Sequence, residues 1–149
     1  MISLTGLSLG SRISLYGLLS LIALLTLVVL WAQIGCIRGR FFANPDGTKD
    51  DWRDQKLFYG IAWADVTVAC PASLAGLALT VIAPRLGLFV LALVSFWLLW
   101  ASVMTTVTSL RFEKPTITLQ WIIVFPLGAL VGLAYIVWVF VHFDVIFGG

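Results

Sequence analysis

The chain alternates between long uncharged apolar stretches and short segments that hold nearly all of its charges. Four stretches carry at most one Asp and no other charged residue, and they cover residues 13–37, 57–84, 86–110 and 115–143. Each has about 25 residues or more, whereas a helix of about 20 residues spans the hydrocarbon core of a bilayer. A spanning segment has to satisfy its backbone hydrogen bonds internally, so each stretch is predicted to be helical. The pattern predicts an all-α, integral membrane four-helix bundle.

The expected helices cover residues of about 12–37, 49–83, 86–110 and 115–143 in a single membrane domain, 1–149. The second helix is predicted to start near Lys49, where Thr48 and the acids after it resemble a capping box. Short connections make consecutive helices antiparallel neighbours, which predicts an up-down-up-down topology.

Two prolines lie inside the expected helices. Pro71 in the second and Pro126 in the fourth each remove a backbone donor, and each is predicted to kink its helix.

Composition supports a membrane location and excludes other classes. The chain is 61% hydrophobic and 11% charged, too apolar for a soluble domain of 149 residues. A net charge of +2 without a basic, aromatic-rich run gives no reason to expect a nucleic-acid partner. Membrane lipids are the expected surroundings, and bound lipid is expected. Cys36 and Cys70 are expected at different depths, so no disulfide is predicted.

The distribution of basic residues predicts the orientation. Basic residues concentrate in cytoplasmic loops, and seven of them follow the first and third expected helices, against Arg12 and Arg85 on the other side. The seven are Arg38, Arg40, Lys49, Arg53, Lys56, Arg111 and Lys114. The prediction is a multi-pass protein of the cell (inner) membrane, with loops 38–56 and 111–114 cytoplasmic and both termini outside.

Asp65 is the residue whose position most needs explaining. An ionisable side chain within a span costs on the order of 2.5–3.5 kcal/mol at the helix centre. On a helix Asp65 shares its face with small residues, which allow close helix approach. These are Ala62, Ala69, Ala72 and Gly76. Asp65 is therefore predicted to point into the bundle.

Several polar residues are expected at a similar depth, in the cytoplasmic half. They are Gln33, Thr67, Thr105, Thr106 and Gln120. Together with Asp65 they are candidates for a polar pocket. Asp65 is then either a proton carrier or the anchor of a cationic ligand. In the alternative interpretation it is a buried hydrogen-bond acceptor or a contact to another subunit, and both interpretations stay open.

The fourth expected helix offers packing residues but no catalytic or metal site. Gly128 and Gly132 form a small-xxx-small pair that predicts a close helix contact, within the bundle or between chains. His142 is the one histidine of the chain and is expected to be exposed at the interface, so no metal or haem site is predicted.

No set of residues typical of a catalytic site is recognised, and no cofactor is identifiable. Cys-x-x-Cys, P-loop and Rossmann glycine patterns are absent from the sequence, and no paired carboxylates are available for acid–base catalysis. Two functions remain. One is a non-catalytic subunit that assembles with itself or with other membrane subunits, with Trp97, Trp100 and Trp138 facing lipid or an interface. The other is a small transporter or ligand- or lipid-binding bundle with its pocket around Asp65.

Overall fold

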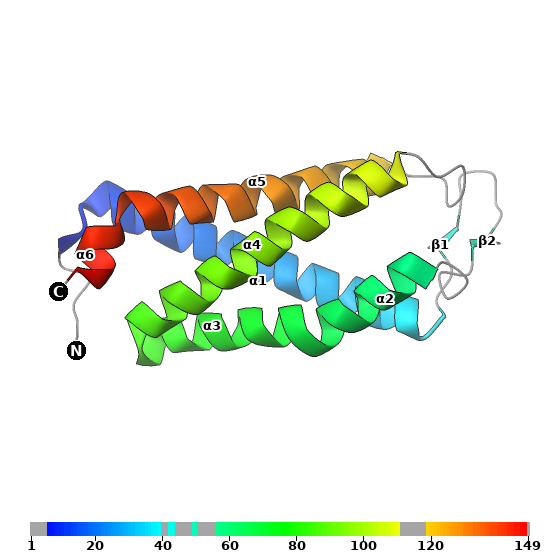
Figure 1. Cartoon of the computed structure of the whole chain (residues 1–149), viewed down its shortest axis with the longest axis horizontal. Coiled ribbons are helices and arrows are strands. Elements are labelled where there is room, and N and C mark those ends of the chain that lie inside the picture. Colours follow the sequence, from blue (N-terminus) through cyan, green and yellow to red (C-terminus); the bar gives the residue numbers. More distant parts are fainter. Residues whose placement is uncertain (1–5, 40–41, 44–48, 51–55, 111–118, 149) are drawn as a thin grey trace.

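The computed structural model describes residues 6–39, 42–43, 49–50, 56–110 and 119–148. Figure 1 shows that this part of the chain forms a bundle of long helices that run alternately in opposite directions. Four helices are long and apolar enough to cross a membrane: Leu9–Ile37, Phe58–Ile82, Pro84–Thr108 and Val124–Val141. The predicted four-helix membrane bundle is confirmed, and the chain is a multi-pass membrane protein.

The first and second spans differ in their construction. Helix α1, Leu9–Ile37, is continuous and starts after Ser8, whose hydroxyl accepts a hydrogen bond from the Ser11 amide. The second span is built from three consecutive segments: helix α2, Lys56–Ala64, the π-helix η2, Asp65–Ala69, and helix α3, Cys70–Ile82.

The other two spans are helix α4, Pro84–Ser109, and helix α5, Leu119–Val141. A short helix α6, Phe143–Phe147, follows α5 and folds back near the start of α1 (Figure 1).

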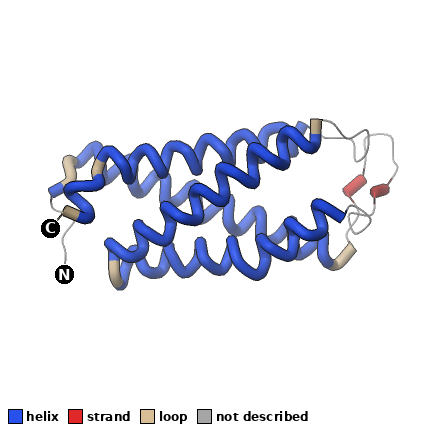
Figure 2. The backbone as a smooth tube through the Cα atoms, in the orientation of Figure 1, coloured by secondary structure: helices blue, strands red, loops and turns tan. Residues whose placement is uncertain are grey.

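The start of the second helix differs from its prediction. Strand β1, Phe42–Ala43, pairs antiparallel with strand β2, Lys49–Asp50, at the end of the bundle opposite the termini (Figure 2). Helix α2 begins only at Lys56, so the helix start expected near Lys49 is wrong. Pairing with β1 gives the backbone of Lys49 and Asp50 partners in an extended conformation, which a helix at this position would lose.

The two prolines have different outcomes. Pro71 is the second residue of α3, which follows the π-helix, and the second span changes direction in this region (Figure 1). Proline has no amide hydrogen and its ring clashes with the carbonyl four residues earlier, here that of Thr67, so a wider turn relieves the clash. Helix α5 continues through Pro126 without interruption, and the kink predicted there stays a prediction.

The turn between α3 and α4 brings two helix backbones into contact. Ala83 alone separates the two helices, and its carbonyl accepts a hydrogen bond from the Gly87 amide at 3.0 Å. A Cβ atom added to Gly87 would lie 2.3 Å from the backbone nitrogen of Thr80. The turn between the two helices is therefore very short, and a glycine permits it.

The apolar core lies in the half of the bundle that contains the termini. Leu15, Leu88, Leu91 and Tyr135 are at most 1% exposed, and the Tyr135 hydroxyl donates to the carbonyl of Leu88 at 3.2 Å. Large apolar side chains also cover the outside of the bundle, with Val81 84% exposed. An outer surface of large apolar side chains suits contact with lipid rather than with water.

His142 differs from its prediction as an exposed interfacial residue. Its ring stacks on the indole of Trp138 with centroids 4.3 Å apart, and both ring nitrogens are in hydrogen-bonding contact. Nδ1 is 2.8 Å from the carbonyl oxygen of Trp138 and Nε2 is 2.9 Å from the hydroxyl of Ser11. Trp138 is itself 7% exposed and donates to the Ser14 hydroxyl, so neither residue faces lipid.

The contact at Gly87 predicts a specific loss of stability. Gly87→Ala is expected to separate α3 from α4 and to lower the free energy of unfolding by about 1–3 kcal/mol. Gly17→Ala is the matched control, because a Cβ atom at Gly17 meets nothing within 4 Å. Unfolding in detergent as SDS is added measures both variants, and equal stability of the two would contradict the close backbone contact.

Candidate functional site

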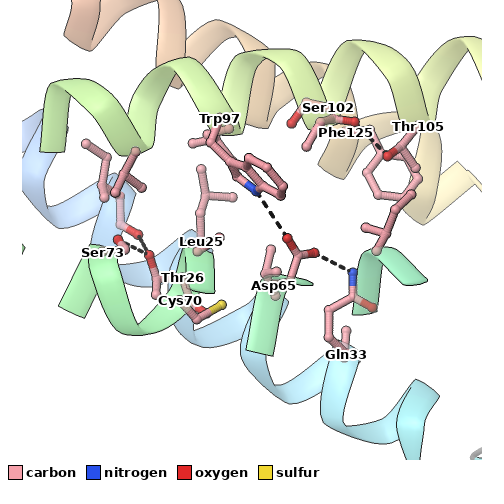
Figure 3. Close-up of a pocket in the computed structure, with 18 of the residues that line it drawn as sticks. Leu25, Thr26, Gln33, Asp65, Cys70, Ser73, Trp97, Ser102, Thr105 and Phe125 are labelled. Carbon is pink, nitrogen blue, oxygen red and sulfur yellow. Dashed lines mark hydrogen bonds between the residues drawn. The ribbon is translucent and has the colours of Figure 1, made fainter. Parts of the chain in front are cut away.

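The Asp65 carboxylate lies inside the bundle and is bound from two other spans. Its side chain is 7% exposed. Gln33 Nε2 on α1 donates to Oδ2 at 2.8 Å, and Trp97 Nε1 on α4 donates to Oδ1 at 3.3 Å (Figure 3). Each carboxylate oxygen thus has one donor, and three of the four spans meet at this side chain.

The π-helix places Asp65 at this meeting point. Asp65 is the first residue of η2, and its carbonyl accepts from the amide of Cys70, five residues on. Ala62, one turn earlier, is fully buried, so the face that bears Asp65 packs inward as predicted. Short π-helical segments within α-helices often coincide with functional sites.

Asp65 lines a cavity of about 110 Å³ between α1, the second span, α4 and α5. Its walls are largely apolar, with Leu25, Val29, Ile61 and Leu98 among the lining residues. A space of this size holds several water molecules or part of a small apolar molecule. Asp65 is thus an ionisable group in the wall of a largely apolar pocket.

Five hydroxyl-bearing residues line the same cavity: Ser95, Ser102 and Thr105 on α4, Thr26 on α1 and Ser73 on α3. Ser95 and Ser102 on α4 are 1% and 6% exposed, and both line the cavity. Thr26 donates to the carbonyl of Ile22 at 2.7 Å, so Ser73 donates to Thr26 across the 2.7 Å between their oxygens. The Thr26–Ser73 pair joins α1 to α3.

The predicted pocket residues are only partly brought together. Gln33 binds Asp65, and Thr105 lines the cavity, although its hydroxyl donates to the carbonyl of Ala101. Thr106 donates to the carbonyl of Ser102 on its own helix. Thr67 is exposed and donates to the carbonyl of Trp63, so it points away from the cavity. The side chain of Gln120 lies outside the described residues.

The predicted packing residues lie at contacts inside this chain. A Cβ atom on Gly76 would meet the side chain of Leu91 at 2.8 Å. One on Gly128 would lie 2.7 Å from the Ser102 hydroxyl, and one on Gly132 would lie 2.8 Å from the Ser95 carbonyl. The small-xxx-small pair of α5 therefore packs against α4 of the same chain. Ala69 lines the cavity, and Ala72 is partly buried.

Sequence reasoning missed Trp97, Thr26, Ser73, Ser95 and Ser102. Trp97 was expected to face lipid or a subunit interface, but its indole nitrogen binds the carboxylate. A signal was available for the serines and Thr26, because hydroxyl side chains within a span favour helix–helix contacts. No such signal distinguishes Trp97 from Trp100, which is 57% exposed.

The site combines one ionisable side chain with neutral hydrogen-bond donors. Among the described residues, no three His, Cys, Asp or Glu side chains lie together as a metal ion would require. Cys36 and Cys70 both line the cavity as buried thiols that form no disulfide. Asp65 is the charged group on the cavity wall, and its partners are neutral donors.

The two donors of Asp65 predict different costs for two neighbouring tryptophans. Trp97→Phe removes one donor from the buried carboxylate and is expected to lower the unfolding free energy by about 0.5–2 kcal/mol. Trp100→Phe removes the same indole nitrogen from a lipid-facing ring and is expected to change stability less. Unfolding in SDS measures both, and equal losses would contradict the hydrogen bond.

No protein-family model matches the chain, and neither the curated proteins nor the solved structures contain a significant match to it.

Proposed function

We propose that the protein binds a small amphiphilic molecule, such as a lipid or a lipid-like metabolite, in the cavity around Asp65. The observation that carries this proposal is the buried carboxylate in the wall of an apolar cavity, with one neutral donor on each oxygen. Small-molecule sites commonly combine apolar walls with a few well-placed polar groups. The cavity around Asp65 has this composition.

The position of the polar groups supports binding over a purely structural role. A carboxylate that only joined helices would be enclosed by its partners, whereas Asp65 also borders open space. The donors from Gln33 and Trp97 hold the carboxylate in place before a ligand arrives. A fixed polar group costs less entropy on binding than a mobile one.

A non-catalytic subunit of a larger membrane complex is the rival proposal. It gains no support from Gly128 and Gly132, because both pack against α4 of the same chain. Native mass spectrometry distinguishes the two proposals, since it reports bound small molecules and the number of chains in the same spectrum.

Filling the cavity tests the binding proposal. Ala101 lines the cavity, so Ala101→Leu is expected to reduce ligand occupancy about tenfold or more. Val103→Leu, on the same helix at a position 49% exposed, is the matched control and should keep the ligand. The measurement is native mass spectrometry of protein purified in lipid nanodiscs, after incubation with an extract of its source membrane. Wild-type protein without a bound molecule, or undiminished occupancy in Ala101→Leu, would sink the proposal.

We further propose that loops 38–56 and 111–114 face the cytoplasm and that both termini lie outside the cell (inner) membrane. The support is the excess of Lys and Arg in these loops, seven against two. Alkaline phosphatase fused after Gly149 is expected to be active, and green fluorescent protein at the same position should stay dark. The reverse pair of results would overturn this orientation.

A further inference from the structure

We infer that the molecule bound in the cavity is a single-chain amphiphile with a protonated amino group, whose ammonium binds Asp65. This inference rests on the proposed ligand-binding function and names the ligand class. Its apolar chain lies along the walls contributed by α1, α2 and α4.

The Asp65 carboxylate keeps unused acceptor positions. A carboxylate offers about four acceptor positions, and Gln33 and Trp97 take one on each oxygen. None of the described Lys, Arg or His side chains forms an ion pair with Asp65. An ammonium supplies further hydrogen-bond donors and a positive charge. Its attraction to a carboxylate is strong in low-dielectric surroundings.

The described basic side chains lie elsewhere. Arg12 donates to the carbonyl of Leu7, at the end of the bundle that contains the termini. Arg85 is in the first turn of α4, next to the turn from α3, and Arg38 follows the end of α1 and is exposed. Among the described residues, none places a cation at the cavity, and we propose that a ligand supplies it.

Two buried hydroxyls of α4, those of Ser95 and Ser102, support the same ligand class. Thr105 and Thr106 satisfy their hydroxyls on carbonyls four residues back, as is usual within a helix. Ser95 and Ser102 are more deeply or equally buried, yet neither hydroxyl has a hydrogen-bond partner among the described residues. Both line the cavity, so a ligand with polar hydrogens would satisfy them.

The spacing of these hydroxyls suits an elongated ligand. Ser95 and Ser102 are seven positions apart, which places them on one face of α4 about two turns from each other. Trp97, which binds Asp65, lies between them in the sequence. A primary ammonium has three N–H donors, so one can bind Asp65 and another a hydroxyl of this face. The apolar walls then receive the chain.

The Trp97 indole offers a direct readout, because its N–H donates to Asp65. Its ¹H–¹⁵N cross-peak, assigned with Trp97→Phe, is followed in nanodiscs during titration with decylamine or decanol. These probes share one chain and differ in the charged head. Trp31, which is 62% exposed, reports partitioning into the surrounding lipid in the same spectra.

Decylamine is expected to shift the Trp97 peak saturably and to bind about tenfold or more tightly than decanol. Asp65→Asn should remove this preference, while Asp65→Glu, which keeps the charge, should retain part of it. Equal binding of decylamine and decanol to the wild-type protein would overturn the inference and leave the binding proposal standing. A preference for decylamine that persists in Asp65→Asn would overturn it as well. No saturable shift with either probe, in a protein without a bound molecule in its mass spectrum, would contradict the proposed function itself.

Discussion

The arrangement of the spans depends on one requirement, that a carboxylate within a membrane must find its hydrogen-bond donors inside the protein. Asp65 meets it with Gln33 from the first span and Trp97 from the third. Each donor comes from a different helix, so the carboxylate fixes three spans at a common depth. In lipid there is no water to replace a lost donor, and this makes the geometry around Asp65 stringent.

The bundle combines a closely packed half with a hollow one. At the turn between α3 and α4, Gly87 lets the two backbones touch, and Gly76 receives the side chain of Leu91 nearby. From this turn α4 crosses diagonally toward α5, where Gly128 and Gly132 bring the two helices together (Figure 1). Helix α4 thereby leaves α2 as it approaches α5, and the cavity lies on the side from which it departs. The hollow is a consequence of helix crossing, not of small side chains alone.

Most of the fold could be predicted from the sequence. The apolar stretches are long and almost free of charged residues, and such stretches form helices in a membrane. The error at Lys49 arose because a capping pattern is local, whereas strand pairing with Phe42 and Ala43 depends on residues earlier in the chain.

The site was only partly predictable, because a sequence indicates the depth of a side chain in the membrane more readily than the direction in which that side chain points. Thr67 lies at the depth of Asp65 but two positions away, and a two-residue step points it toward the opposite side of the helix. Trp97 lies in an apolar run that offers no periodic signal, so its direction depends on the tilt of α4. The inward face of Asp65 was predictable because small residues mark it.

The π-helix has a further consequence for how the second span tolerates change. One additional residue per turn rotates everything beyond it by about 100° relative to a regular α-helix. Helix α3 can therefore present Gly76 to α4, while α2 buries Ala62 and Asp65, the first residue of η2, lines the cavity. Deleting one residue between 66 and 69 would restore a regular α-helix. Either Gly76 would then turn away from α4, or the Asp65 carboxylate would turn toward lipid. The second span thus consists of two helices whose inward faces point in different directions, and the proposed binding site lies where they join.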